Sequence, residues 1–351
     1  MKIIYSEQHY QQSPKLELAG GDLVPSFENP SRAEHVLERV KTVGLGEIIT
    51  PDEFGIQPLL AVHDAAYVRF LQTAWQEWTE AGFKGEIIPL CWPAGQASDV
   101  LPRHIKGKVG YYAQGTDSNI TDGTWTAAFA AAQSALTGAA LICDSAKTAR
   151  NSKKVAAFSL GRPPGHHAAK SSYGGYCFLN NAAIAAQYCR DQGIVKVAVL
   201  DVDFHHGNGT QDIFYDRDDV FFASIHGDPM DNFPYFWGHT SEQGEGIGEG
   251  FNLNFPLSNG TTFAVWREAL KSSLSRINEF GAEVLIVSLG VDTFEDDPIS
   301  SFKLKTQDFL VMGVDIADLG IPTLFVMEGG YNVEELGINM VNVLQGYETS
   351  L

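Results

Sequence analysis

An apolar run at residues 195–202 leads directly into a cluster of acidic and imidazole side chains that reads D-V-D-F-H-H at 201–206. Residues two apart in an extended chain face the same way, so Asp201, Asp203 and His205 are expected to project together at the carboxyl end of a strand. Ligands bind at that end of an open parallel sheet. Two carboxylates need a cation between them to converge there. An isolated motif of this kind is more simply a hydrogen-bonded strand end with a structural histidine, so its neighbours decide the interpretation.

Three further apolar runs are followed by residues that can do chemistry. They are His166 and His167 after 155–160, Asp292 after 284–289, and Tyr331 after 323–327. The carboxyl ends of parallel strands lie at one edge of a sheet, so all of these groups meet in one cleft if the four strands belong to the same sheet. The sequence therefore predicts one composite site.

Asp203, His205 and Asp292 form a ligand set typical of catalytic zinc. Three protein ligands leave a fourth position for water, whereas a structural zinc site is closed and usually contains cysteine. The four cysteines form no C-x-x-C pair and lie away from the motif. A bound zinc ion would act as a Lewis acid and lower the pKa of a water molecule.

The remaining convergent groups suit acyl chemistry. His166 and His167 can act as general base and general acid near neutral pH, and Tyr331 can donate a hydrogen bond to a developing oxyanion. Together with the ligand set, they predict a metal-assisted hydrolase that acts on an acyl carbonyl. His206 faces away from the ligand set on the strand period, so a structural role is expected for it.

The elements that must position these groups follow an α/β pattern, because apolar runs rich in β-branched residues alternate with helical patterns in the second half of the chain. Strands are predicted at residues 1–6, 155–160, 195–202, 220–225, 284–289 and 323–327, and helices at 32–43, 64–78, 125–142, 180–190 and 262–280. The last helix carries apolar residues at spacings of three and four, and Gly281 follows it as a stop. No repeat or linker divides the chain, so one domain spanning 1–351 is expected.

The composition excludes several classes of protein. The 351 residues contain 24 Lys and Arg against 43 Asp and Glu, a formal charge of −19, so the chain lacks the basic footprint of a nucleic-acid backbone binder. An acidic field would attract cationic small molecules, although it also serves solubility. No run approaches the roughly 20 apolar residues of a membrane helix, and no signal-peptide pattern precedes the first strand. Since the cysteines lie in or beside apolar runs, a cytoplasmic protein is expected.

Residues 82–123 contain glycine, proline, lysine and aspartate without a sustained period, which indicates a long irregular insertion. Loops of this length are usually functional or lie at an interface. Asp117 in this segment and Glu17 near the N-terminus could reach the rim of the cleft and pair with a distal ammonium group. Lys106 and Lys108 lie in the same segment and could oppose a polycation.

Five motifs occur in the chain in this order: R-P-P-G-H-H (162–167), G-G-Y-C-F-L-N-N (174–181), D-V-D-F-H-H-G-N-G-T (201–210), S-L-G-V-D (288–292) and E-G-G-Y (328–331). They resemble the motifs of the histone deacetylase superfamily of zinc amidohydrolases, and residues 16–25 and the insertion are most similar to the bacterial acetylpolyamine amidohydrolases. The resemblance implies a single-domain, three-layer αβα fold of the arginase/deacetylase type with an eight-stranded parallel sheet. It also implies a homodimer in which the insertion at about 82–123 lies at the dimer interface and narrows the channel entrance.

The resemblance also implies a role for each matching residue. Asp203, His205 and Asp292 would be the zinc ligands, and Tyr331 would polarise the amide carbonyl. His167 would be the general base and acid, with His166 as its electrostatic partner and Asp201 behind it. A monovalent cation, usually potassium, would be held by Asp201, Asp203, His205, Ser224 and Ile225. A second such cation would lie near Phe214, Arg217 and Val220. Tyr176 and Phe233 would form the walls of the channel.

Two positions depart from relatives of the fold. Asn208 stands where class I deacetylases carry aspartate, and asparagine keeps the hydrogen bond to His167 while removing a charge. His167 is therefore expected to stay neutral more readily. Arginase-like relatives hold two manganese ions with an additional aspartate where this chain has Gly290, so the second metal would lose a ligand here. This difference favours a single zinc ion.

The function that the resemblance implies is removal of acetyl groups from N-acetylated polyamines or diamines, such as acetylputrescine, acetylcadaverine and acetylspermidine, to give acetate and a free amine. The alternative among enzymes is a protein or free acetyl-lysine deacetylase, which an open channel in a monomer would favour. A catalytically silent acyl-ligand binding protein is disfavoured because the zinc ligands and the tyrosine are all present. Iron or cobalt could replace zinc with similar ligands.

Overall fold

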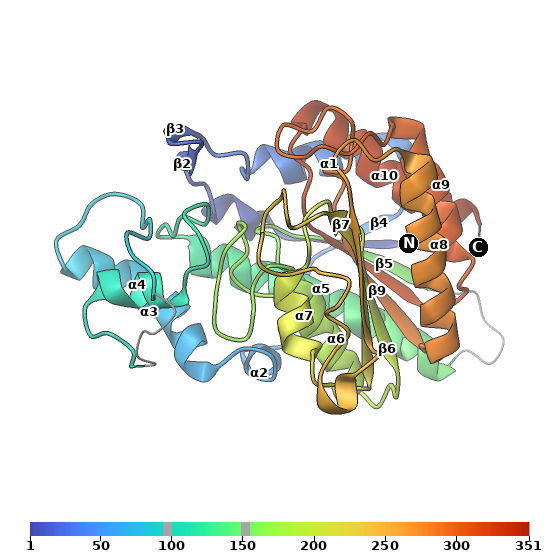
Figure 1. Ribbon diagram of the computed structural model, residues 1–351, viewed down its shortest axis with the longest axis horizontal. Helices are drawn as coiled ribbons and strands as arrows, with labels where there is room; N and C mark the ends of the chain where they lie inside the picture. Colours follow the sequence, from blue (N-terminus) through green and yellow to red (C-terminus); the bar gives the residue numbers. More distant parts are fainter. Residues whose placement is uncertain (94–99, 149–154, 351) are drawn as a thin grey trace.

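The computed structural model describes residues 1–93, 100–148 and 155–350. Its centre is an eight-stranded sheet in the order β4-β1-β5-β10-β9-β6-β7-β8, in which every neighbouring pair is parallel. The strands are β1 (Lys2–Tyr5), β4 (Glu47–Ile49), β5 (Ala156–Leu160), β6 (Val197–Asp201), β7 (Val220–Gly227), β8 (Asn252–Leu257), β9 (Val284–Leu289) and β10 (Thr323–Met327). Figure 1 shows helices on both faces of this sheet. The expected single α/β domain with an eight-stranded parallel sheet is thereby confirmed.

Successive residues of each central strand point to opposite faces, and helices cover both. Val197 and Val199 of β6 pack in one core, and Ala198 and Leu200 of the same strand pack in the other. The first core includes α5 (Thr124–Thr148) and α6 (Asn181–Asp191); the second includes α1 (Ser31–Val43), α8 (Phe263–Phe280), α9 (Thr306–Ala317) and α10 (Val333–Thr349). Full burial of a Val, Leu or Ile side chain stabilises the fold by about 1.5–3 kcal/mol. The two-sided core therefore holds the central strands, and with them their carboxyl ends, in a fixed register.

Each predicted strand is present, with bounds that agree to within two residues. The predicted stop of α8 is also confirmed, because Gly281 has a φ of 76° and its N–H is bonded to the carbonyls of Ile277 and Asn278. β4 and β8 lie outside the predicted strands, and α9 and α10 lie outside the predicted helices. β4 has three residues and β8 carries Asn252 and Asn254, so neither edge strand has a continuous apolar run.

Residues 82–123 are more regular than expected, because they contain α4 (Ile105–Tyr112), which packs against α3 (Ala65–Glu80). Residues 94–99 of this segment lie outside the described residues. Lys108 of α4 forms an ion pair with Glu77 of α3 at 2.6 Å, and the Lys106 ammonium group lies 4.5 Å from the centroid of the Phe83 ring. Both lysines that could have opposed a polycation therefore have local partners.

The remaining elements are short. They are α2 (Gln57–Leu60), α7 (Asn208–Phe214), two 3-10 turns (Glu7–Gln11 and Gly246–Gly248), and an antiparallel hairpin formed by β2 (Leu16–Ala19) and β3 (Asp22–Pro25). Figure 1 shows this hairpin projecting from the body of the protein, on the same side as α3 and α4. The hairpin and the α3–α4 region thus extend the edge of the domain beyond the main sheet.

Within the described residues, α5 is the one helix long and apolar enough to cross a membrane. This differs from the expectation that no run approaches that length. However, 72% of its most apolar window is buried inside the protein, where α5 packs on α6 and β5. A mostly buried apolar helix of this kind is a core helix.

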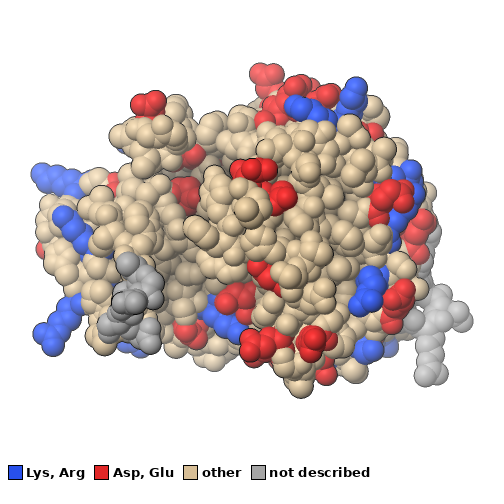
Figure 2. Space-filling view, viewed as in Figure 1, with Lys and Arg blue, Asp and Glu red and all other residues tan. Residues whose placement is uncertain are grey.

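Charged side chains of both signs are exposed on the face of the protein shown in Figure 2. Figure 2 shows acidic and basic side chains mainly around the edges of one face, with large uncharged areas between them. The chain has 43 acidic and 24 basic residues, and the acidic side chains visible on this face do not form one patch.

Candidate active site

Four adjacent strands, β5, β10, β9 and β6, end side by side and carry the candidate site. Asp201 at the end of β6 is opposite Ser288 of β9, and Leu289 of β9 is opposite Met327 of β10, so these strands end at the same level. The segments that follow supply His166 and His167 after β5, Asp203 and His205 after β6, Asp292 after β9, and Tyr331 after β10. The structure therefore brings together the groups that the sequence placed in one cleft.

Asp203, His205 and Asp292 offer ligand atoms that all lie within 4.8 Å of one another. Both carboxylates are fully buried, and His205 is 9% exposed. Backbone amides orient the carboxylates: Gly329 N donates to Asp203 Oδ2 at 2.7 Å, and Phe204 N donates to Asp292 Oδ1 at 2.8 Å. The three side chains are therefore held as one group before any ion is considered.

Asp203, His205 and Asp292 form a site that favours a bound positive charge. Burial alone would lower the pKa of His205, but the hydrogen bonds and charges of Asp203 and Asp292 raise it to about 10. Burial, and then the charge of Asp203, raises the pKa of Asp292 to about 7. Two carboxylates buried together are costly without a positive charge between them. One imidazole and two carboxylates suit zinc or another first-row divalent ion, so the residues fit the metal that the resemblance implies.

A second group of possible ligands, formed by His166, Cys177 and Glu328, fits a metal less well. Glu328 Oε2 already accepts hydrogen bonds from Gly165 N at 2.6 Å and His166 N at 3.2 Å. Cys177 Sγ donates to Gly175 O at 3.2 Å. Burial raises the pKa of the Cys177 thiol well above its usual value, which disfavours the thiolate that a metal requires. These contacts instead brace the histidine pair.

His166 and His167 lie in different environments. His166 Nδ1 is 2.9 Å from Asp201 Oδ2, and His167 Nδ1 is 2.7 Å from Asn208 Oδ1, which is the hydrogen bond expected from the sequence. Burial alone would lower the pKa of His166, but nearby carboxylates, Asp201 foremost, raise it to about 10. Burial, and then the charge of His166, lowers the pKa of His167 well below its usual value. His167 is therefore a neutral imidazole that can take a proton, while His166 stays charged.

A pocket of about 250 Å³ opens onto these groups. His167, His205 and Tyr331 line it together with Tyr176 and Phe233, the two aromatic residues expected as channel walls. The Phe233 ring lies edge-on to His167 with centroids 5.0 Å apart, and the rings of Tyr176 and Tyr331 are 5.5 Å apart. An amide that enters between these walls meets the neutral histidine, the tyrosine and the ligand group.

The two acidic residues expected at the rim occupy different positions. Asp117 lines the pocket, as does Asp231, which was not predicted, whereas Glu17 is absent from the described residues that line it. Glu17 Oε1 accepts a hydrogen bond from the Tyr176 hydroxyl at 2.8 Å, and Oε2 accepts one from Phe27 N at 3.0 Å. Glu17 thus holds the tyrosine wall, and Asp117 and Asp231 are the acidic residues among the described residues that line the pocket.

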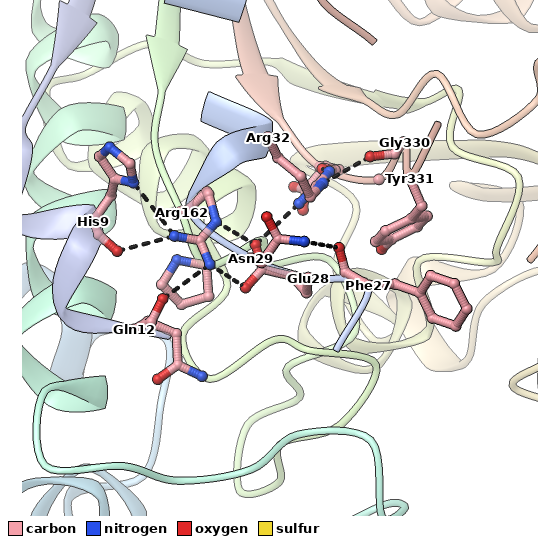
Figure 3. A network of polar contacts seen from close by, with 12 residues as sticks. His9, Gln12, Phe27, Glu28, Asn29, Arg32, Arg162, Gly330 and Tyr331 are labelled. Carbon is pink, nitrogen blue, oxygen red and sulfur yellow. Dashed lines mark hydrogen bonds and ion pairs between the residues drawn. The ribbon is translucent and has the colours of Figure 1, made fainter. Parts of the chain in front are cut away.

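Tyr331 is positioned by a buried arginine of α1 (Figure 3). Arg32 is fully buried and donates to the carbonyl oxygens of Gly330, at 2.7 Å, and Glu328. Its guanidinium carbon lies 4.7 Å from the centroid of the Tyr331 ring, a cation–π contact. The segment that carries the tyrosine is therefore anchored to a helix far from it in sequence.

Glu28 joins Arg32 to Arg162 of the R-P-P-G-H-H motif. It accepts from Arg32 at 3.1 Å and from two nitrogens of Arg162 at 2.5 and 2.6 Å. Arg162 also donates to the backbone oxygens of His9 and Gln12 at 3.0 Å (Figure 3). Burial would raise the pKa of Glu28, but the two guanidinium groups hold it below its usual value. The carboxylate therefore stays charged and keeps the cluster together.

The residues expected around the first monovalent cation lie at the end of β6, just after it and within β7. Asp201 is directly opposite Ser224 in the β6–β7 register, and Asp203 N donates to Asp201 Oδ1 at 3.1 Å. Ile225 follows in the same strand. Among the residues expected around the second cation, Phe214 lies at the end of α7, Arg217 in the turn after it and Val220 at the start of β7.

His206 points away from the ligand group, with Nε2 3.1 Å from Asn254 Oδ1.

Four residues of the site were missed from the sequence: Glu28, Arg32, Gln114 and Asp231. Glu28 and Arg32 are four residues apart, a spacing that could have indicated an ion pair at the start of a helix. No local signal marks Gln114, because its hydrogen-bond partners His167 and Asn208 are 53 and 94 residues away.

Comparison with known proteins shows similarity along nearly the whole chain. Residues 26–347 match the family described as histone deacetylase domain. The chain is 53% identical over 346 residues to an acetylpolyamine amidohydrolase of Mycoplana ramosa, with 99% of each chain covered. It is 52% identical over 348 residues to acetylpolyamine amidohydrolase 2 of Pseudomonas aeruginosa, again with 99% of each covered.

Solved structures agree with the sequence matches. The crystal structure of an acetylpolyamine aminohydrolase from Burkholderia pseudomallei matches with a TM-score of 0.92 at 36% identity, covering 100% of this chain and 99% of that one. The HD domain of HDA15 matches with a TM-score of 0.78 at 26% identity, covering 99% and 89%. The similarity thus extends to the complete sheet and to all the segments that carry the site.

Proposed function

The chain belongs to the family of histone deacetylase domains, and from this premise we propose that it is a zinc-dependent amidohydrolase that removes acetyl groups from N-acetylated polyamines or diamines. The observation that carries the proposal is the composition of the pocket. It joins a neutral imidazole, a tyrosine and a metal-ligand group to Asp117 and Asp231, and no Lys or Arg is among the described residues that line it. Such a pocket suits a cationic substrate with an acetyl amide at one end.

Asp203, His205 and Asp292 would hold the zinc ion, which when bound supplies Lewis-acid polarisation of the acetyl carbonyl and acidifies water. His167 takes the proton of the attacking water on Nε2, because its Nδ1 is bound to Asn208 and its neutral form is favoured. The same imidazole then returns the proton to the leaving nitrogen. Acetate and a free amine result.

Tyr331 stabilises the negative charge that develops on the carbonyl oxygen. Burial raises the pKa of its phenol well above 10, so the hydroxyl is protonated at neutral pH and can donate a hydrogen bond. Arg32 holds the backbone that leads into the tyrosine, at the carbonyl oxygens of Glu328 and Gly330. The proton donor therefore stands ready before substrate binds.

The test is a comparison of kcat/KM for the zinc-loaded enzyme on acetylputrescine, acetylcadaverine, acetylspermidine and an acetyl-lysine peptide. We expect the small acetylated amines to exceed the peptide by about tenfold or more, a difference of about 1.4 kcal/mol. A better rate on the peptide would establish a lysine deacetylase instead. Zinc binding without turnover on any acetyl amide would establish a binding protein.

Asp117 supplies a second, sharper test. The variant Asp117→Asn keeps an oxygen that can accept from Gly175 N, a bond of 3.0 Å, but loses the charge. It should lower kcat/KM for acetylputrescine roughly 10- to 100-fold, the worth of a hydrogen bond to a charged group. N-pentylacetamide, which has a methyl group in place of the ammonium, should be affected little. Equal losses on both substrates would remove Asp117 from substrate recognition.

The proposed homodimer is supported by apolar side chains exposed at one end of the domain. They are Leu16, Leu18 and Leu23 of the β2–β3 hairpin and Leu90, Trp92 and Val100 of the segment after α3. Exposed apolar groups of this kind mark interaction surfaces. Light scattering should give a dimer that Leu23→Glu dissociates, and a monomeric native enzyme would contradict the proposal. The four described cysteines are free, as in proteins of the cytoplasm, which is the proposed location.

Potassium is proposed beside Asp201 and Ser224, which are paired in the register of the neighbouring strands β6 and β7. An ion that binds only the folded chain raises its stability with the logarithm of the ion concentration once that concentration exceeds the dissociation constant. The unfolding temperature should therefore be higher in potassium chloride than in tetramethylammonium chloride at equal ionic strength. Ser224→Ala should abolish the difference, and equal temperatures for the native enzyme would contradict the proposal.

A further inference from the structure

We propose that Gln114 is a positioning residue that orients the amide of Asn208 and thereby selects the tautomer of His167. The inference rests on the proposed function in one respect, since it explains how His167 is kept ready as the base. Gln114 is not among the described residues that line the catalytic pocket. Gln114 lies just after α4, in the segment 82–123.

Hydrogen bonds connect Gln114 to His167 by two routes. Gln114 Nε2 donates to the backbone oxygen of His167 at 2.9 Å and to Ser172 Oγ at 2.9 Å. Gln114 Oε1 accepts from Asn208 Nδ2 at 3.1 Å. Asn208 Oδ1 in turn is 2.7 Å from His167 Nδ1. The circuit starts at the backbone of His167 and ends on its own ring.

The direction of this circuit is set at its starting point. A backbone carbonyl can only accept, so the end of Gln114 that faces the His167 carbonyl must be the amide nitrogen. Gln114 Oε1 then faces Asn208 and requires a donor, which is Nδ2. Asn208 Oδ1 is left facing the ring and requires a proton on His167 Nδ1. A neutral imidazole protonated at Nδ1 carries its lone pair on Nε2, the nitrogen assigned to take the proton of water.

Asparagine needs this orientation, whereas aspartate would not. A carboxylate presents an acceptor oxygen in either orientation, so a rotation about its last bond changes nothing. The amide of Asn208 is different, because a half-turn would place Nδ2 against His167 Nδ1 and favour the proton on Nε2, which would block the base. Gln114 is the group that makes the two orientations of Asn208 unequal.

The backbone around the circuit is shaped to hold it. A Cβ atom on Gly174 would lie 2.6 Å from Gln114 Cβ, and one on Gly175, where φ is +54°, would lie 2.1 Å from His167 Cδ2. Gln114 N also donates to Tyr173 O at 2.7 Å. The two glycines thus allow the segment 173–175 to pass close to both the glutamine and the imidazole.

Solvent access determines which substitution tests the idea. Gln114 and Asn208 line a hollow of about 410 Å³, separate from the catalytic pocket, in which the described lining residues also include Asp64 and Asp212. Shortening Gln114 to alanine would admit water, which could replace its hydrogen bonds. Gln114→Met is better, because it keeps the length of the side chain and removes both polar ends.

The kinetic experiment compares Gln114→Met in two backgrounds, the native enzyme and Asn208→Asp, each at the pH of its maximal rate. In the native background kcat should fall roughly fivefold or more, as expected for the loss of a neutral hydrogen bond that selects the active form. In the Asn208→Asp background the same substitution should lower kcat by less than about twofold, because aspartate needs no orienting group and offers no donor to Gln114 Oε1. Equal losses in both backgrounds would mean that Gln114 only supports the fold, and would overturn the proposal.

A spectroscopic readout removes the dependence on turnover. The ring nitrogens of His167 are observed by NMR in the zinc-loaded enzyme with ¹⁵N-labelled histidine, and their signals are assigned by their loss in His167→Phe. The native enzyme should show a protonated Nδ1 and a bare Nε2, and Gln114→Met should show a mixture of the two tautomers.

Unchanged ring signals in Gln114→Met would overturn the proposal even if activity fell. If Gln114→Met does not fold, Gln114→Glu serves instead, since its second oxygen would face the acceptor carbonyl of His167 and disturb the same circuit. A native enzyme with this tautomer but no deacetylase activity would contradict the proposed function alone.

Discussion

Gly290 lies against the carboxylate of Asp203 so closely that a Cβ atom on it would be 2.0 Å from Asp203 Oδ2. Gly329 approaches the same group, and its Cβ would be 2.4 Å from Asp203 Oδ2 and 2.6 Å from Asp292 Oδ2. No side chain at either position fits without displacing a proposed ligand. The second-metal aspartate of arginase-like relatives therefore has no room here, quite apart from the missing charge.

We predict one zinc ion per chain, and a loss of zinc affinity in Gly290→Ala. The added methyl group must push Asp203 away from its present position, and displaced ligand contacts of this kind cost roughly 10- to 100-fold in metal affinity. Competition with a chromophoric chelator measures the affinity, and elemental analysis measures the stoichiometry. Gly85→Ala is the matched control, because a Cβ atom there meets nothing within 4 Å. Two ions per native chain, or equal affinities of the two variants, would contradict the prediction.

Removing only the hydroxyl of Tyr331 should impair turnover and little else. In Tyr331→Phe, the ring can keep its contact with Arg32, and the backbone bond from residue 331 N to Asp297 Oδ2, of 2.8 Å, does not involve the side chain. Loss of one donor to a developing oxyanion lowers kcat by roughly 10²- to 10³-fold. Steady-state kinetics should show this fall with little change in KM, zinc content or unfolding temperature. A raised KM with kcat retained would assign the hydroxyl to substrate binding instead.

The buried carboxylate of Glu28 should contribute far more to the unfolding free energy than an exposed carboxylate does. Glu28→Gln leaves Arg32 and Arg162 buried with their charges uncompensated, a loss that costs about 3–5 kcal/mol of unfolding free energy. Glu47→Gln is the control, because Glu47 pairs with Lys2 at a similar distance, 2.7 Å, but at the surface. Its loss should cost about 1 kcal/mol or less. Urea unfolding measures both, and similar losses for the two variants would refute the structural role of Glu28.

Features that depend on neighbouring residues could be predicted from the sequence, whereas features that depend on contacts between distant segments could not. The apolar run Val197–Asp201 by itself indicates a buried strand, and the two-residue spacing of Asp203 and His205 matches the strand period. The strand and the position of these two side chains could therefore be predicted. β8 could not, because its asparagines bond to Gln211 across the fold and interrupt the apolar run. Gln114 acts through partners distant in sequence, and nothing local distinguishes it from a surface residue. Arg32 has one local signal, its spacing of four residues from Glu28, but its contacts with Glu328 and Gly330 are distant in sequence.

The neutral form of His63 is fixed by two opposite hydrogen bonds. Its Nδ1 donates to Ala169 O at 2.9 Å, and its Nε2 accepts from Asn180 N at 2.9 Å. Burial lowers its pKa to about 4, although the hydrogen bond to Ala169 and the charge of Asp64 act in the other direction. An unfolded histidine has a pKa of about 6.5. Between about pH 6.5 and 4 the unfolded chain therefore binds a proton that the folded chain does not, and stability falls as the pH falls through this window.

We predict that His63→Gln weakens this dependence on pH. Each pH unit within the window changes the unfolding free energy by at most about 1.4 kcal/mol per such group. Because the unfolded histidine is only half protonated at pH 6.5, the variant should lose about 1.6 kcal/mol less than the native chain between pH 6.5 and 5. Urea unfolding at the two pH values gives the difference. His9 and His226, whose pKa values burial also lowers to about 4, leave a residual slope in the variant. The exposed residue His35 provides the control, because His35→Gln should keep the native slope; a native slope in His63→Gln as well would show that protonation of His63 does not oppose folding.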